Sequence, residues 1–309
     1  MKEASFANWV QEWILDIKDH DAYLAKLGSE RLNYLKQKAA PDAWVPETTT
    51  ESARVDFNKE PNALERLVVA AGKVIANRCK TKGFKTMLAG LGLPNLAAWL
   101  AAYNLKESGQ MVDLVAEIGM YGYLPRTSDP TVFSFHNYHT CKMLSNIETA
   151  LGYMVGGSTN QCLGVLGAGQ LDKFGNANST KITDDFFLVG SGGANDIAST
   201  NQETIVVMNA GKERLVDKVP YITYPGKKVK TLVTDGGVFK KDKENDTFIL
   251  TAYLPSYSDE KQEQSIANLK ESVGWDLKIS SKIERLELPT PEEITLLRLF
   301  DPRGYFIES

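Results

Sequence analysis

A single glutamate stands out among the residues that could carry covalent chemistry. Glu117 follows the apolar run 112–116 and precedes Ile118 and Gly119. The run is predicted to be a parallel strand, and open α/β sheets place their ligands at the carboxyl ends of such strands. A carboxylate in this position can act as a nucleophile or as a general base. A solvated or salt-bridged acid at a strand end is the alternative interpretation.

A glycine-rich segment further along the chain has the residue types of an anion-binding turn. Residues 190–196 read Gly-Ser-Gly-Gly-Ala-Asn-Asp and follow the apolar run 185–189, which we expect to be a strand. A helix-compatible stretch comes next, so the backbone amides of the turn would point at one spot near a helix N-terminus. Such amides stabilise an oxyanion. A simple strand-to-helix turn that needs glycine for its conformation is the alternative.

Another glycine cluster imitates a cofactor-binding turn without completing it. Gly90 and Gly92 stand between a predicted strand and a predicted helix, and Asp113 lies about 20 residues further on, as in a nicotinamide dinucleotide site. The third glycine of that motif is missing, and Pro94 opens the helix instead. The sequence contains no Gly-Lys-Ser/Thr of a P-loop. A nicotinamide dehydrogenase is therefore an open but disfavoured alternative.

Neither the histidines nor the cysteines form a catalytic or metal-binding pattern. His136 and His139 have the spacing His-x-x-His without the further ligands of a metal site, so we expect no bound metal. Cys79, Cys141 and Cys162 are odd in number and far apart. This spacing argues against disulfides and favours a reducing compartment. The sequence contains no Gly-x-Ser-x-Gly nucleophile elbow.

The elements expected around these residues alternate between helices and strands. Helical patterns cover 61–78, 93–103, 260–271 and 292–300. Short apolar runs predict strands over 85–89, 111–116, 163–166, 186–189, 204–208, 229–233 and 247–253. Strands that alternate with helical stretches indicate βαβ units. The predicted fold class is α/β, with a largely parallel open sheet flanked by helices.

The start of the chain differs from the rest. Apolar residues such as Trp9 and Trp13 recur at helical spacing and predict an amphipathic helix. The stretch 40–50, with two prolines and three threonines, is expected to be an extended connector. We therefore predict a helical arm and connector over 1–60 and a catalytic domain over 61–309. The arm is expected to pack on its own domain or to clasp a partner subunit.

Composition excludes several classes of function. The chain has 309 residues, with 35 Lys and Arg against 39 Asp and Glu, and a formal net charge of −4. This charge is too small, and has the wrong sign, for a nucleic-acid binder. No segment reaches the roughly 18 consecutive apolar residues of a membrane span, and the N-terminus lacks the apolar core of a secretory signal. We expect a cytoplasmic protein with neither a nucleic-acid nor a membrane partner.

The motifs, taken in order, resemble those of one enzyme family. The series comprises Gly90-x-Gly92-x-Pro94, Glu117-x-Gly119, Gly167-Ala-x-Gln170-x-Asp172, Gly192-Gly-Ala-Asn-Asp196, Val233-Thr-Asp-Gly-Gly-Val-Phe and Gly274-Trp-Asp-Leu. Together these segments are similar to the β subunits of class I coenzyme A-transferases, especially the glutaconate and 3-oxoacid types. The resemblance extends over residues 64–304.

The resemblance implies a ping-pong reaction centred on Glu117. In this family a glutamate attacks an acyl-CoA thioester, giving a mixed anhydride and then a glutamyl-CoA thioester. A free carboxylate or a CoA thiolate can open such an anhydride, so CoA passes from an acyl-CoA to a free carboxylic acid without hydrolysis. No permanently bound cofactor is implied. The family's usual Ser-Glu-Asn-Gly reads Ala-Glu-Ile-Gly over 116–119, so an apolar residue follows the expected nucleophile.

The resemblance also implies a binding site for the thioester. The backbone amides around Gly192, Gly193 and Ala194 would stabilise the oxyanion of the tetrahedral intermediate. Gln170 would line the same cleft. The other residues of the matching motifs would support the site, namely Gly119, Asn195 and Asp196.

A partner protein is implied as well. No Gly-Gly-Phe element of the family's α subunit occurs in this chain, so an α subunit is expected to complete an active site at the interface. Ring-opening hydrolases and a decarboxylase use the same scaffold without the glutamate, and Glu117 therefore favours transfer. Hydrolysis or decarboxylation of an acyl-CoA, and a non-catalytic assembly subunit, stay open as alternatives. Dicarboxylic, 3-oxo and aromatic acyl groups are all compatible with the sequence.

Overall fold

The computed structural model divides into two compact units, Met1–Glu47 and Thr48–Ser309. It describes residues 3–38, 40, 42, 44–157, 161–242 and 246–308. The predicted boundary lies at residue 60, whereas residues 48–60 belong to the larger unit. The Arg298 guanidinium donates to the backbone oxygens of Asp56 and Lys59, both at 2.8 Å.

The first unit is helical. Its elements are α1 (Glu3–Val10), η1 (Gln11–Leu15) and α2 (His20–Lys38), and α3 (Trp44–Ser52) spans the boundary. The extended connector predicted over 40–50 is wrong where α3 forms. Pro46 is the third residue of that helix, where no intrahelical N–H bond is required, so the proline starts the helix rather than preventing it.

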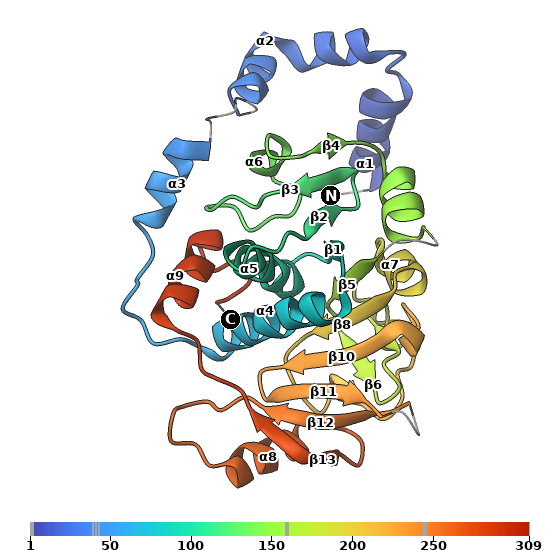
Figure 1. Ribbon diagram of the computed structural model, residues 1–309. Helices are drawn as coiled ribbons and strands as arrows, with labels where there is room; N and C mark the ends of the chain where they lie inside the picture. Colours follow the sequence, from blue (N-terminus) through green and yellow to red (C-terminus); the bar gives the residue numbers. More distant parts are fainter. Residues whose placement is uncertain are drawn as a thin grey trace. The chain divides into compact units, whose positions relative to one another are not determined.

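The second unit is built on a mixed ten-stranded sheet (Figure 1). Its order is β13-β12-β11-β10-β8-β5-β1-β2-β3-β4. The five neighbouring strands at its centre run parallel, namely β10 (Val229–Thr234), β8 (Glu203–Val207), β5 (Cys162–Leu166), β1 (Thr86–Ala89) and β2 (Asp113–Ala116). These strands are apolar almost throughout because both faces of the sheet are covered. The predicted α/β class with a largely parallel open sheet is confirmed.

The remaining strands extend this centre. β3 (Met120–Tyr123) and β4 (Met143–Leu144) continue it antiparallel beyond β2. On the other side, β11 (Gly237–Lys241) and β12 (Phe248–Tyr253) are antiparallel, and β13 (Lys278–Arg285) pairs parallel with β12. A separate small sheet contains β6 (Gln170–Asp172), β7 (Ala177–Asn178) and β9 (Leu215–Val216).

Two hydrophobic cores fill the two faces of the large sheet. Successive residues of a strand point to opposite faces, so Met87 belongs to one core and Leu88 to the other. The first core lies under α4 (Ala63–Lys82), α5 (Leu93–Glu107) and α9 (Pro291–Phe300). The second packs against η2 (Thr149–Val155), α7 (Ala194–Thr200), α8 (Gln262–Glu271) and the small sheet. Two short helices complete the unit, α6 (Phe135–Tyr138) and η3 (Gly226–Lys228).

Capping boxes set the starts of two helices on the first face. Asn62 exchanges hydrogen bonds with Glu65 at the start of α4, and Thr290 does so with Glu293 at the start of α9. Arg298 on α9 then donates to both oxygens of Glu65, at 2.6 and 3.1 Å, and both side chains are buried. This pair joins the two helices that the sequence predicts separately.

One predicted strand is wrong. Residues 186–189 form a loop with a single isolated bridge, between Phe187 and Lys181. Their side chains are exposed, with fractions of 57% for Phe186, 64% for Phe187, 39% for Leu188 and 58% for Val189. An apolar run becomes a buried strand only where another surface covers it, and the described residues of this chain do not cover this one.

Candidate active site

Glu117 lies in a tight turn at the carboxyl edge of the parallel strands. β2 ends at Ala116 and β3 begins at Met120, and these two residues pair across the hairpin. The Gly119 amide donates to the Ala116 oxygen at 3.0 Å. Gly119 has φ of +103°, and a Cβ there would overlap the backbone of Ser145. Glycine therefore fixes the turn that presents Glu117.

The structure brings Glu117 together with Gly193. A Cβ added at Gly193 would overlap the Glu117 carboxylate oxygen and lie 3.7 Å from Leu151 Cδ1. Ala116 packs in the first core, so the next side chain points to the opposite face, where η2 and α7 lie. Two motifs that are far apart in the sequence thus meet at one point.

The turn before α7 has two amides available to a ligand. Gly193 is the N-cap of α7, and Gly192 adopts a left-handed φ of +52°. The Ala194 amide donates to Ser191 O at 3.2 Å and is therefore already engaged. Within the described ranges, the amides of Gly192 and Gly193 have no hydrogen-bond acceptor. An anion beside Glu117 would find these two donors.

Three other predicted site residues lie in α7 or in the small sheet. Asn195 and Asp196 are exposed in the first turn of α7, and the Asn195 oxygen accepts from Ser199 at 3.2 Å. Gln170 begins β6, where its amide donates to Glu213 O and accepts from Asn178, both at 3.0 Å. Both ends of the Gln170 side chain are thus engaged outside the turn that holds Glu117.

The glycine-rich loops after β1 and β5 flank the point where the strand order reverses. From β1 the chain continues to β2 on one side, whereas β5, β8 and β10 follow on the other. A Cβ at Gly90 would lie 3.5 Å from Leu166 Cδ2, and one at Gly167 would lie 3.4 Å from Pro94 Cγ. These loops are therefore closely apposed at a topological switch point, the usual ligand position in open sheets.

Sequence reasoning missed one cation at this edge. Arg214 follows β8 and donates to Ala168 O at 3.1 Å. Its Nε is buried and has no partner among the described residues. Burial lowers the pKa of the Arg214 guanidinium, and the nearby Asp235 carboxylate opposes that shift. The polar loop that carries Arg214 matches no motif, so only its position after a parallel strand could have indicated it.

The thiols and histidines do not add reactive groups. Burial raises the pKa of Cys79 to about 12 and those of Cys141 and Cys162 to about 11, so these thiols stay protonated and unreactive. His136 is buried in α6, and His139 is its C-cap residue. Across the part of the chain that is described, no three His, Cys, Asp or Glu side chains gather into a potential metal site. In the same residues, no helix combines the length and apolar character of a membrane span.

Fold and site together define an open α/β protein with a carboxylate held against glycine backbone at the carboxyl edge of its sheet. No family model matches the chain. It is 30% identical over 258 residues to the β subunit of glutaconate CoA-transferase from Acidaminococcus fermentans, covering 74% of this chain and 90% of the relative. It is 28% identical over 258 residues to the β subunit of 3-oxoadipate CoA-transferase from Pseudomonas knackmussii, covering 77% and 93%. The chain therefore belongs to the CoA-transferase family, among its β subunits, and the predicted family and enzyme class are confirmed.

Solved structures agree with this assignment. The crystal structure of the Acidaminococcus fermentans glutaconate CoA-transferase matches with a TM-score of 0.67 and 27% identity, covering 82% of this chain and 99% of that one. The decarboxylase AibA/AibB matches with a TM-score of 0.58 and 19% identity, covering 80% and 97%. Rhodococcus jostii IpdAB matches with a TM-score of 0.60 and 16% identity, covering 81% of this chain and 100% of that one. These last two likenesses show a shared fold.

Proposed function

We propose that Glu117 carries CoA as a glutamyl thioester between an acyl-CoA and a free carboxylic acid. The observation that carries this proposal is the contact between the Glu117 carboxylate and the Gly193 backbone. In this proposal the nucleophile and the two amide donors act on the same reacting carbonyl group. Membership of the CoA-transferase family supports this use of the site.

The first half of the reaction forms two covalent intermediates in turn. A Glu117 oxygen attacks the thioester carbonyl carbon, and the bond to sulfur breaks to release CoA thiolate and leave a mixed anhydride. The thiolate then attacks the side-chain carbonyl of Glu117, which releases the first acid as its carboxylate and leaves a glutamyl-CoA thioester. The acceptor carboxylate repeats these steps in reverse. Atoms balance without water, metal or a redox cofactor.

Each addition places negative charge on a carbonyl oxygen. The amides of Gly192 and Gly193 are the donors proposed to stabilise this oxyanion, because they have no acceptor within the described ranges. The loss of one such donor typically raises a barrier by about 3–4 kcal/mol. The Ala194 amide is a less suitable donor for the oxyanion because it already donates to Ser191 O.

Apolar neighbours would protect the anhydride from water. Leu151 lies beside the position that a Cβ of Gly193 would take, and Ile118 follows the nucleophile directly. Exclusion of water from a closed site suppresses hydrolysis of reactive intermediates. The apolar residue after Glu117 is thus compatible with transfer.

An α subunit is proposed to close the site. The exposed apolar residues of the loop 186–189 directly precede the glycine turn, and exposed apolar patches of this kind mark protein interfaces. The curated relatives are themselves named as subunits of CoA-transferases. We expect the double variant Phe186→Ser, Phe187→Ser to lose co-purification with the α subunit while it keeps its own melting temperature. Undiminished co-purification would place the interface elsewhere.

The test of the proposed nucleophile is acyl-CoA exchange by the assembled enzyme. Glu117→Gln is expected to lower kcat by at least about 10⁴-fold, as removal of a covalent nucleophile does. Glu107→Gln, at the end of α5, is the matched control and should retain full activity. A Glu117→Gln enzyme with unchanged exchange would leave this chain as an assembly subunit. Release of free acid and CoA by the wild type without an acceptor would indicate a hydrolase.

A further inference from the structure

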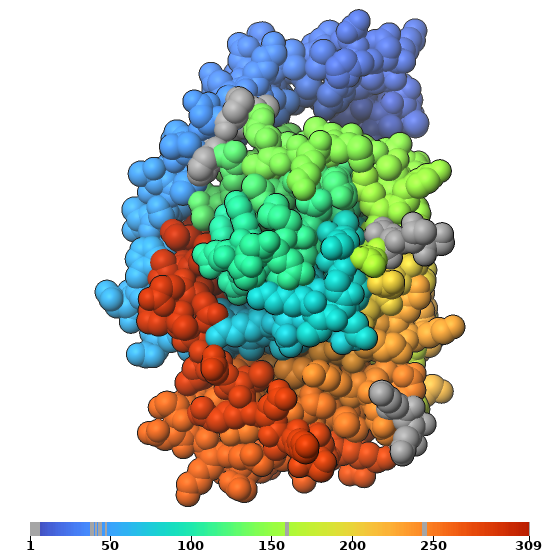
Figure 2. All heavy atoms as spheres, in the orientation of Figure 1, coloured from blue at the N-terminus to red at the C-terminus, as the bar shows by residue number. Residues whose placement is uncertain are grey.

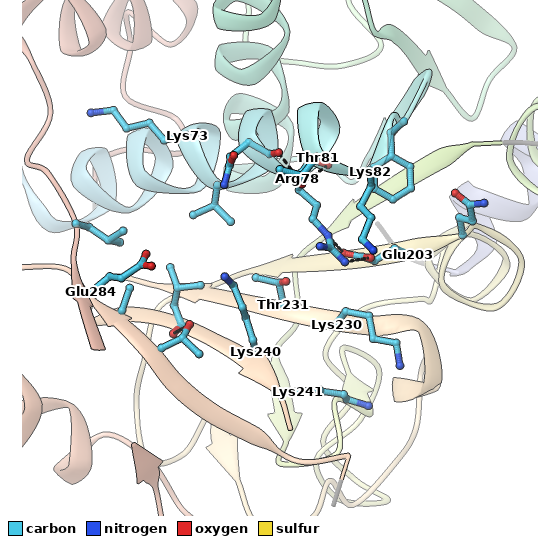
Figure 3. A pocket seen from close by; sticks show the side chains of 18 residues that line it. Lys73, Arg78, Thr81, Lys82, Glu203, Lys230, Thr231, Lys240, Lys241 and Glu284 are labelled. Carbon is cyan, nitrogen blue, oxygen red and sulfur yellow. Dashed lines mark hydrogen bonds and ion pairs between the residues drawn. The ribbon is translucent and has the colours of Figure 1, made fainter. Parts of the chain in front are cut away.

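A cavity of about 1130 Å³ lies between α4 and the outer half of the large sheet. Residues of α4, of β10–β13 and at the start of β8 line it (Figure 3). In the space-filling view, α4 borders these strands directly (Figure 2). We call this cavity the α4 groove.

The α4 groove is separate from the candidate active site. Glu203 is the first residue of β8, Lys230 is the second of β10, and Phe84 precedes β1, so the groove lies at the amino-terminal ends of parallel strands. Glu117 follows the carboxyl end of β2. The groove also opens on the face of α4, whereas Glu117 points toward α7.

Cations outnumber carboxylates among the lining residues. The lining cations are Lys73, Arg78, Lys82, Lys230, Lys240 and Lys241, and the lining carboxylates are Glu203 and Glu284. Two of the cations are neutralised by carboxylates. Arg78 donates two bonds to Glu203, at 2.7 and 2.6 Å, and Lys73 lies 2.9 Å from Glu293.

The other four cations do not all face the groove. Lys241 and Lys230 share the Asp246 carboxylate, at 3.2 and 3.8 Å. Lys241 also donates to Gly226 O at 2.8 Å, and because it follows Lys240 on β11 its side chain points to the second face of the sheet. Lys82 and Lys240 have no acidic partner among the described residues. Figure 3 shows Lys82 reaching from α4 to a point beside Glu203, and Lys240 rising from the sheet on the other side of Thr231. The side chains of Lys230 and Lys241 extend away from α4 in the same view. Among the described residues, Lys82 and Lys240 are thus the unpaired cations of the groove, and Glu284 is its unpaired carboxylate.

The groove also offers uncharged polar groups. Asn77, Gln202 and the buried Thr231 supply further hydrogen-bonding side chains to its walls. Cations that approach from several elements require a ligand with several separate negative groups, and lysine binds phosphate oxygens as a point charge. The cations lie inside a cavity rather than along an extended stripe, which favours a small ligand over nucleic acid.

We propose that the α4 groove binds a small polyanion that carries two or more phosphate groups. Lys82 and Lys240 are its principal charge partners. Free polyphosphates and nucleotides share this chemistry. Coenzyme A also carries several phosphate groups, so the lysine variants, and not binding alone, assign the ligand to the α4 groove.

The experiment is calorimetric titration of the full chain, in complex with its α subunit, with inorganic tripolyphosphate and with ATP. Lys82→Gln and Lys240→Gln are each expected to weaken Kd by about fivefold, and the double variant by more than about tenfold. Lys106→Gln is the matched control, since Lys106, like Lys82, lies in the last turn of a helix. It should bind like the wild type. Sodium chloride should weaken binding to the wild type.

The two probes distinguish the two sources of ligand. Equal affinity for both would indicate that the phosphate chain alone is recognised, and tighter binding of ATP would indicate a nucleotide. Absence of saturable binding at low salt would overturn the proposal. Binding that survives the double substitution, or that Lys106→Gln weakens equally, would overturn it as well. Thermal melting of each variant verifies that it is folded.

Discussion

The two ends of the central sheet are built in different ways. At the carboxyl edge, one carboxylate lies against glycine backbone, and the geometry depends on positions where a Cβ would collide. At the amino edge, long charged side chains from separate elements converge on the α4 groove. Positions that require glycine form motifs that can be recognised in the sequence, whereas lysines that come together from separate elements form no such motif. The motifs could therefore indicate Glu117 and the glycine turn from the sequence, whereas the lysines of the α4 groove came to light only in the structure.

The sharpest test of the backbone-built site is Gly193→Ala. Its Cβ would displace the Glu117 carboxylate, so kcat is expected to fall by about 10²–10³-fold, as it does when an oxyanion donor is lost. Gly190→Ala is the matched control, because a Cβ at Gly190 has no neighbour within 4 Å. Steady-state kinetics would compare the kcat values of the two variants with that of the wild type. Equal activity of the two would separate Gly193 from the chemistry.

A smaller effect is expected on stability at the turn itself. Gly119→Ala should lower the free energy of unfolding by about 2–3 kcal/mol, because it combines a left-handed φ with overlap on the Ser145 backbone. Gly109→Ala shares the positive φ but has open space, and should cost about 1 kcal/mol. Urea unfolding measures both. If Gly109→Ala lowered the free energy of unfolding as much as Gly119→Ala, the overlap with the Ser145 backbone would contribute nothing to the loss.

In the side-chain-built region, Glu203→Gln should have a more modest effect. It removes the charge that holds Arg78 and is expected to lower the unfolding free energy by about 1–2 kcal/mol. Glu284→Gln, in the same groove, removes a carboxylate without an ion-pair partner among the described residues and should stay within about 0.5 kcal/mol of wild type. Denaturant titrations would show whether the groove is stabilised through that single pair.

The smallest expected effect is the pH dependence of the ion pair between Glu51 and Arg303. The hydrogen bond from Arg303 lowers the pKa of Glu51 below its ordinary value, despite opposition from burial. The pair therefore stabilises the fold above the unfolded-state pKa, and this contribution is lost as the pH falls through the lower folded-state value. Because Arg303 is half exposed, Glu51→Gln should cost only about 0.5–1 kcal/mol at pH 7. The difference from wild type should shrink below about pH 4; a constant difference would contradict the assignment.

Elements with a strong local pattern could be predicted from the sequence. The apolar centre of the sheet and helices α4, α5, α8 and α9 lie close to their predicted ranges. β13 was missed because its side chains are largely exposed and polar, and β3 because Gly122 interrupts a short strand. The loop 186–189 was wrongly predicted as a strand because exposed and buried apolar runs look alike in sequence. Within the site, glycine spacing indicated the turns, but nothing local indicated Arg214 or the α4 groove.

The most direct test of the central claim is chemical trapping of the glutamyl intermediate. The assembled enzyme is incubated with dicarboxylyl-, 3-oxoacyl- and aroyl-CoA thioesters without an acceptor acid, treated with hydroxylamine, digested and analysed by mass spectrometry. We predict a hydroxamate on Glu117, and none in Glu117→Gln. Rapid release of CoA and free acid with no adduct on Glu117 would contradict the account.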